Sequence, residues 1–171
     1  RKQAKMEDKR PLIIMSPKSL LRHPMATSKA EELAEGSYHP TLRDQDLSDR
    51  EQAEKLILCS GKVYYDLLKH RLDNEIDNIA LVRLEQFYPF PDKDIREILN
   101  DYNHVKDIVW CQEEPRNMGA WFFVSNRISN ELQDGQQLSY VGRQASASPA
   151  TGQKKIHEAE QKRLIEEAMT V

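Results

Sequence analysis

Two adjacent glutamates follow a short apolar run in the segment CQEEP, residues 111–115. Paired carboxylates can act as a general acid and a general base, and ligands of open α/β sheets bind at the carboxyl ends of the strands. However, side chains that are neighbours along a strand point to opposite faces. We therefore predict a structural or interface role for Glu113 and Glu114, and we assign no catalytic residue here.

The segment VGRQASASPATGQ, which begins at Val141, contains three serines and threonines among small residues. The G-x-S-x-G pattern of a nucleophilic serine is absent from it. We interpret the segment as a connector from a strand to the last helix, with Thr151 or a nearby serine as the helix cap. Arg143 stays a candidate for contacting an anionic ligand.

The segment CSGK, residues 59–62, has the order strand, glycine turn and helix. A helix N-terminus beside Gly61 and Lys62 could hold a phosphate. The phosphate-binding patterns G-x-x-x-x-G-K-[ST] and G-x-G-x-x-G are both absent. A tight turn is therefore the preferred interpretation, with phosphate binding as the alternative.

The two cysteines, Cys59 and Cys111, lie inside apolar runs and form no C-x-x-C pair. No histidine or second cysteine stands at ligand spacing from either of them, so we predict two buried free thiols and no metal site. The five histidines are scattered along the chain, and none is placed to indicate a catalytic triad.

The composition predicts one globular domain. The chain has 171 residues, 39% hydrophobic and 31% charged, with 25 basic and 28 acidic side chains and a net charge of -3. This balance gives no electrostatic reason to expect nucleic acid or an anionic membrane as a partner. No apolar run approaches the roughly 20 residues that a membrane-spanning helix needs.

Five apolar runs predict strands, and the first four do not alternate with polar residues, as is typical of strands buried on both faces. They cover residues 11–15, 55–59, 79–84, 105–111 and 138–142. Helical periodicity separates them, at about 63–72, 92–102, 121–132 and 153–169. We predict a layered α/β domain with a mostly parallel sheet. In the first crossover we expect a helix near 27–34 and an exposed charged loop over 43–54.

The link EQFYPFP, residues 85–91, is rich in aromatic side chains and proline. Pro89 and Pro91 favour an extended backbone. One small loop is not expected to bury Phe87, Tyr88 and Phe90 without a partner, so we predict an interface at these three residues.

Several motifs together carry a family resemblance: RPLIIMSPKSLLRHP, CSGKVYYDL, ALVRLEQFYPFP, WCQEEPRNMGAW and GRQASASPATG. They run in order along nearly the whole chain. On these residues the sequence resembles the C-terminal domain of the E1 component of 2-oxoglutarate dehydrogenases.

The resemblance implies a fold similar to the transketolase C-terminal domain: three layers, with a five-stranded, mainly parallel sheet that has one reversed strand and is flanked by helices. It also implies a homodimeric enzyme that uses thiamine diphosphate and magnesium, decarboxylates 2-oxoglutarate and passes the succinyl group to a lipoyl arm of the E2 succinyltransferase. The family holds this cofactor in larger upstream domains. We therefore expect residues 1–10 to be a linker, residues 11–171 to be the domain, and the isolated chain to bind no cofactor and to be inactive.

The resemblance also suggests what this domain contacts. The aromatic link, Glu113, Glu114 and Trp121 would pack against the rest of E1 and its second subunit. An alternative role is a regulatory module for acetyl-CoA or AMP, because Gln86 and Lys93 match contacts found in some relatives. Asp94 replaces a second basic residue of that site, and Ser37 and Pro40 replace a lysine and a serine, which weakens the match.

Three alternatives stay open at this level. The substrate is 2-oxoglutarate or 2-oxoadipate, because the E1 of 2-oxoadipate dehydrogenase has a similar C-terminal domain. The compartment is the cytoplasm in a bacterium or the mitochondrial matrix in a eukaryote. An independent flavodoxin-like binding protein would share only the topology.

Overall fold

The computed structural model describes residues 2–14 and 16–171, and the chain divides into two compact units, Arg1–His39 and Pro40–Val171. The first unit contains α1 (Lys2–Lys5), the 3-10 helix η1 (Lys18–Arg22) and α2 (Ala30–Ala34). The helix expected near 27–34 is therefore present but shorter. Its N-terminus is closed by Glu32, whose carboxylate accepts a 2.9 Å hydrogen bond from the N–H of Lys29.

The strand predicted over 11–15 is wrong for the residues that the structure describes. Residues 11–14 lie in neither helix nor strand, and Leu12, Ile13 and Ile14 are 62%, 84% and 72% exposed. Met15 and Arg1 lie outside the described residues. A strand needs a neighbour to pair its N–H and C=O groups, and no described residue of this chain pairs with the segment.

The second unit is built on a five-stranded sheet of order β1-β3-β2-β4-β5. Its strands are β1 (Thr41–Leu42), β2 (Lys55–Cys59), β3 (Ile79–Leu84), β4 (Asp107–Pro115) and β5 (Gln137–Arg143). β1 pairs antiparallel with β3, and the other pairs are parallel. This confirms the α/β class and the single reversed strand, although the fifth strand is Thr41–Leu42 instead of residues 11–15.

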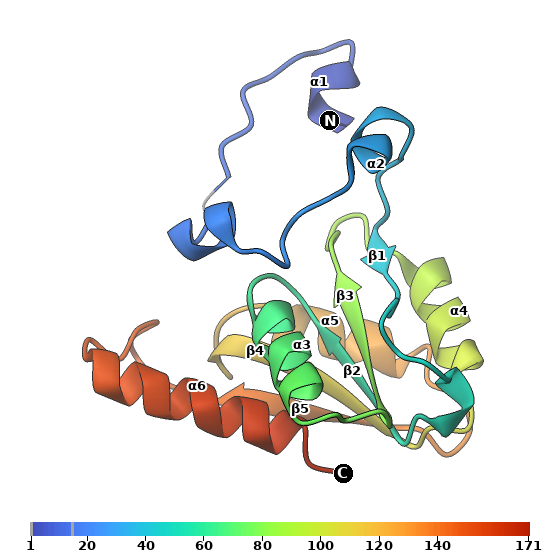
Figure 1. Cartoon of the computed structure of the whole chain (residues 1–171), viewed down its shortest axis with the longest axis vertical. Coiled ribbons are helices and arrows are strands. Elements are labelled where there is room, and N and C mark those ends of the chain that lie inside the picture. Colours follow the sequence, from blue (N-terminus) through green and yellow to red (C-terminus); the bar gives the residue numbers. More distant parts are fainter. Residues whose placement is uncertain (1, 15) are drawn as a thin grey trace. The chain divides into compact units, whose positions relative to one another are not determined.

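Helices cover both faces of the sheet. Figure 1 shows α3 (Val63–Asp73) and α6 (Lys154–Ala168) on one face, and α4 (Asp92–Asp101) and α5 (Trp121–Ser129) on the other. α4 illustrates why they form: Ile95, Ile98 and Leu99 recur at helical spacing and are buried, and its first turn is acidic, which suits the helix dipole. None of the helices in the described residues is long and apolar enough to cross a membrane.

The loop over 43–54, expected to be exposed, contains a buried ion pair. β1 covers β3 only at Arg83 and Leu84, so the preceding part of that strand edge would be open. Asp44 accepts a 2.7 Å hydrogen bond from the N–H of Leu81, and Arg71 of α3 donates a 3.0 Å bond to the C=O of Ile79. The Asp44 and Arg71 side chains pair with each other at 1% and 3% exposure. The pair seals the edge of β3, and the rest of the loop includes the 3-10 helix η2 (Arg50–Gln52).

Candidate functional site

The candidate site lies where the chain connections diverge at the carboxyl edge of the sheet. From β2 the chain passes to β3 on one side, and from β3 it crosses to β4 on the other side. Such a point leaves a crevice between the two strands, where α/β domains bind ligands. A cavity of about 460 Å³ lies here, with Trp110 and Gln112 at its base, Phe87 and Phe123 in its walls, and Tyr88 and Glu114 also lining it.

Gln112 organises the base of this cavity. Its side-chain oxygen accepts hydrogen bonds from Trp110 Nε1 at 2.9 Å and from the N–H groups of Ala120 and Trp121 at 3.2 and 3.0 Å. Its nitrogen donates to the C=O of Met118 at 2.8 Å. The buried amide therefore holds the loop between β4 and α5. Sequence reasoning missed Gln112, although a polar residue directly after the run IVWC was the available signal.

Gly119 is required by this arrangement. It has φ +67, and a Cβ at this position would lie 2.9 Å from Gln112 Nε2 and 3.0 Å from Glu114 Cβ. Glycine is the residue that combines the left-handed conformation with such a close approach.

The aromatic link is only partly available to a partner. Phe87 stacks edge-to-face on Trp110 and on Phe123, and Phe90 stacks on Phe123 in the same way. Phe87 and Phe90 are thus half-buried within their own domain, and an interface at these two residues stays a prediction. Tyr88 is 86% exposed, and an interface at this residue also stays a prediction.

The two glutamates of β4 point to different environments, as predicted from their spacing. Glu113 Oε1 lies 3.2 Å from Lys62 Nζ, and Lys62 also contacts Asp66. Glu114 instead lines the cavity. Burial lowers the pKa of Lys62, but its hydrogen bond to Asp66 and the charges of Glu113 and Asp66 raise the pKa above its usual value. The ammonium group of Lys62 is thus already paired with two carboxylates. The structure therefore gives no support to phosphate binding beside Gly61 and Lys62.

The three effector candidates are not brought together. Gln86 donates to the C=O of Pro89 at 2.8 Å, and Lys93 is exposed in the first turn of α4. Arg143 ends β5, which is separated from β3 by two strands, a span of about 14 Å at the usual strand spacing.

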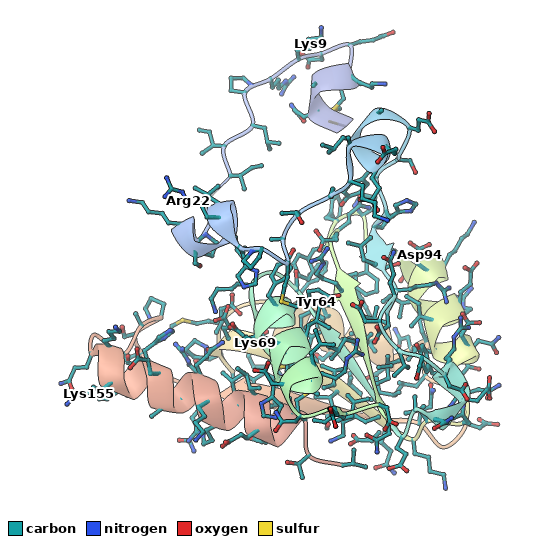
Figure 2. All side chains as sticks on the ribbon, viewed as in Figure 1. Lys9, Arg22, Tyr64, Lys69, Asp94 and Lys155 are labelled. Atoms are coloured by element: carbon teal, nitrogen blue, oxygen red, sulfur yellow. The ribbon has the colours of Figure 1, made fainter. Side chains whose placement is uncertain are left out.

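Arg143 is buried, and its guanidinium group contacts two side chains of α6. Its Nη2 lies 2.6 Å from His157 Nδ1, and its Nε lies 3.4 Å from Glu160 Oε2. Asp94, which is labelled in Figure 2, lies in the first turn of α4. Its carboxylate accepts a 3.4 Å hydrogen bond from Thr41 Oγ1.

Trp121 is half-buried, and its ring centroid lies 5.1 Å from that of Tyr140. The Tyr140 hydroxyl donates to the C=O of Glu114 at 3.2 Å and of Arg143 at 3.1 Å. Burial raises the pKa of Tyr140 to about 12. Trp121 thus contacts its own domain while keeping a surface that a partner could cover.

The segment after β5 is a connector, as predicted. Asn117 and Ser146 exchange two hydrogen bonds, of 2.9 and 3.0 Å, which tie it to the loop after β4. The predicted cap is wrong: α6 has Gln153 at its N-cap position without a side-chain hydrogen bond. Thr151 Oγ1 instead donates to the C=O of Gln153 at 3.1 Å.

The two thiols are free and buried, which confirms that prediction. Cys59 and Cys111 are register partners on β2 and β4. Burial raises the pKa of both, in the case of Cys111 to about 12. Thiolates are the reactive form, so burial disfavours the reactive state of both side chains. In residues 2–14 and 16–171 no group of three or more His, Cys, Asp or Glu side chains could hold a metal ion.

The sheet order, the helix pair on each face and the crevice between β2 and β4 define a three-layer α/β domain with a ligand-sized cavity at its carboxyl edge. Residues 27–169 match the family model described as 2-oxoglutarate dehydrogenase C-terminal. The chain belongs to this family, which confirms the resemblance found in the sequence.

Similar proteins support the same assignment. The 2-oxoglutarate dehydrogenase E1 component of Haemophilus influenzae is 45% identical over 170 residues, which cover 99% of this chain and 18% of that protein. The oxoglutarate dehydrogenase of Buchnera aphidicola is 48% identical over 171 residues, 100% of this chain and 19% of that protein. The chain therefore spans about a fifth of the length of these relatives.

Proposed function

We propose that this chain is the C-terminal domain of a 2-oxoglutarate dehydrogenase E1 component. The enzyme would oxidatively decarboxylate 2-oxoglutarate and transfer the succinyl group to the lipoyl arm of an E2 succinyltransferase. The observation that carries the proposal is the 45% and 48% identity to two such proteins along 99% and 100% of the chain. Identity at this level over a whole domain goes with a shared place in the parent protein.

We propose that the domain serves assembly. Its second unit exposes two large aromatic side chains, Tyr88 at 86% and Phe122 at 70%. Its first unit exposes Leu12, Ile13 and Ile14 in a continuous apolar run. Exposed apolar surface of this kind marks protein contacts. The remainder of the E1 polypeptide and its second subunit would contact these residues.

Thiamine diphosphate and magnesium would be held by other parts of E1. The described residues do not fit the cofactor, because they contain no cluster of carboxylates, histidines or thiols suited to a metal ion. The compartment follows from the proposed enzyme: the cytoplasm in a bacterium, or the mitochondrial matrix in a eukaryote.

The test of the enzymatic proposal uses the full-length protein that carries this chain. We expect it to release carbon dioxide from 2-oxoglutarate when thiamine diphosphate and magnesium are supplied, and to do so faster than from 2-oxoadipate. The 171-residue chain under the same conditions should stay at background. Release from 2-oxoadipate alone would assign the domain to the related dehydrogenase, and release by the short chain would refute its dependence on the rest of E1.

The test of the assembly role places a charge on the exposed aromatic positions of the full-length protein. Tyr88→Asp and Phe122→Asp should each shift the protein from dimer towards monomer in sedimentation velocity. Lys155→Asp, on α6 (Figure 2), is the matched control because Lys155 is exposed and polar. An unchanged dimer in both aromatic variants would contradict an assembly role for Tyr88 and Phe122.

Binding of acetyl-CoA or AMP stays a prediction that rests on Gln86 and Lys93. Titration calorimetry with each ligand tests it, with Lys93→Ala as the variant that should abolish the heat. Arg143→Ala is less informative, because Arg143 is engaged with His157 and Glu160 and its loss would disturb α6.

A further inference from the structure

The cavity between β2 and β4 is lined mainly by aromatic and other uncharged residues. Four of its lining side chains are aromatic: Phe87, Tyr88, Trp110 and Phe123. Among the described residues that line it, Glu114 is the only one with a charged side chain, and no lysine, arginine or histidine takes part. A phosphate or carboxylate of a ligand would find no cation inside this cavity.

The polar groups at the base of the cavity are already engaged. Trp110 Nε1 donates to Gln112. The Gln112 amide also bonds to the C=O groups of Pro115 and Met118 and to the N–H groups of Ala120 and Trp121, between the end of β4 and the start of α5. Glu114 differs, because it is exposed at the rim of the cavity and its carboxylate makes no hydrogen bond or ion pair within the described part of the chain. Its neighbour Glu113 is paired with Lys62.

We propose that this cavity binds a compact organic cation, a guanidinium or alkylammonium group with an apolar stem. Glu114 would supply the counter-charge, and the rings of Phe87 and Tyr88 would contact the cation and its stem through their electron-rich faces. A volume of about 460 Å³ lies in the range of small-ligand pockets and accommodates the stem as well as the head group.

The same chemistry occurs elsewhere in this domain. The guanidinium carbon of Arg127 lies 3.8 Å from the ring centroid of Phe123, and that of Arg83 lies 4.6 Å from the ring of Tyr64. Arg127 already occupies Phe123, so the incoming cation contacts Phe87, Tyr88 and Glu114 instead. The carboxylate of Glu114 is the feature that selects a cation over a neutral ligand of equal shape.

The 171-residue chain is a suitable sample for the test. Pro40–Val171 contains a complete five-stranded sheet with buried residues on both faces, and near-ultraviolet circular dichroism verifies its folding in each variant. The probes are butylguanidinium, its neutral analogue butylurea and the anion pentanoate, followed by the amide signals of ¹⁵N-labelled protein in nuclear magnetic resonance spectra.

We expect butylguanidinium to shift the signals of residues 60–61, 87–88 and 112–120 with a Kd on the order of 1 mM, as befits so small a ligand. Butylurea and pentanoate should bind roughly two- to fivefold more weakly, since they lose a charge-assisted contact to an exposed carboxylate. Glu114→Gln should remove this preference. Glu113→Gln is the matched control, because its side chain points to the opposite face, and it should bind as the wild type does.

Two arms distinguish the sources of the cation. A capped Gly-Arg-Gly peptide that binds more tightly than butylguanidinium would assign the cavity to an arginine side chain of a partner protein. The reverse order would assign it to a free small molecule. Equal binding of butylurea and butylguanidinium, or an unchanged Kd in Glu114→Gln, would overturn the proposal.

Discussion

The two faces of the sheet are stabilised in different ways. The face under α4 and α5 is an apolar cluster that includes Leu58, Trp110 and Ile98. On the α3 and α6 side, ion pairs anchor the connections: Arg71 with Asp44, Lys62 with Glu113, and Arg143 with Glu160. β4 serves both, since its alternate residues point to alternate faces. Apolar burial thus holds both layers together, with Leu67 of α3 and Leu164 of α6 fully buried, and on the α3 and α6 side charged pairs also fix where loops and helix ends lie.

The largest effect should come from breaking the buried pair on the charged side. Asp44→Ala leaves Arg71 buried without a counter-charge, and we expect the free energy of unfolding to fall by about 3 to 5 kcal/mol. Urea denaturation measures this. Asp46→Ala, at an exposed position in the same loop, should cost far less. The double variant Asp44→Ala/Arg71→Met should recover part of the loss, and no recovery would contradict a charge-based cause.

A cavity in the apolar face should cost slightly less. Leu58 is 2% exposed in the central strand β2, and Leu58→Ala should lower the free energy of unfolding by about 3 kcal/mol. High salt leaves hydrophobic burial intact, so the loss should be the same at low and high ionic strength. A strong dependence on salt would mean that the two faces are not separate in their energetics.

The buried Cys111 thiol of β4 makes the free energy of unfolding depend on pH, which gives a further test of the comparison. Burial, followed by the charges of Glu113 and Glu167, raises its pKa from 9.0 to about 12. The unfolded chain therefore loses this proton first, so the stabilisation is complete below pH 9 and is lost as the pH rises towards 12. Relative to Cys111→Ala, the wild type should lose on the order of 2 kcal/mol between pH 8 and pH 11. Parallel pH profiles of the two proteins in urea denaturation would show that the thiol is not protected by burial.

The smallest effect should come from an exposed pair on α3. Lys69 Nζ lies 2.6 Å from Asp73 Oδ2, with both side chains more than half exposed. Figure 2 labels Lys69 on this helix. Lys69→Ala should change the free energy of unfolding by no more than about 0.5 kcal/mol, and the difference should fade in high salt. A loss comparable to that of Asp44→Ala would show that burial does not set the strength of these pairs.

Sequence patterns predicted the helices and strands that are specified by residues close together in the sequence. The spacing of Ile95, Ile98 and Leu99 marked α4, and the apolar runs marked β2 and β3 at their observed bounds. β1 could not be found this way, because two residues carry no periodicity and their pairing depends on β3. The burial of Asp44 depends on Arg71, 27 positions further along the chain, so composition alone placed it in solvent.

The candidate site was likewise predicted only in part. The position of Glu114 at a strand end and its divergence from Glu113 followed from the sequence. The cavity beside it did not, because it is formed by residues from the ends of three strands and from α5. Likewise, nothing local indicated that Arg143 would be engaged by α6 instead of facing a ligand.

The seal formed by Asp44 and Arg71 has a consequence for the newly made chain. Until both residues are in place, the apolar strand Ile79–Leu84 presents free N–H and C=O groups along one edge. Such an edge is a template for a strand of another molecule. Loss of the pair should therefore lower the yield of soluble protein during synthesis more than its equilibrium cost implies. Asp44 therefore protects the newly made chain from pairing with other copies of itself at this strand edge.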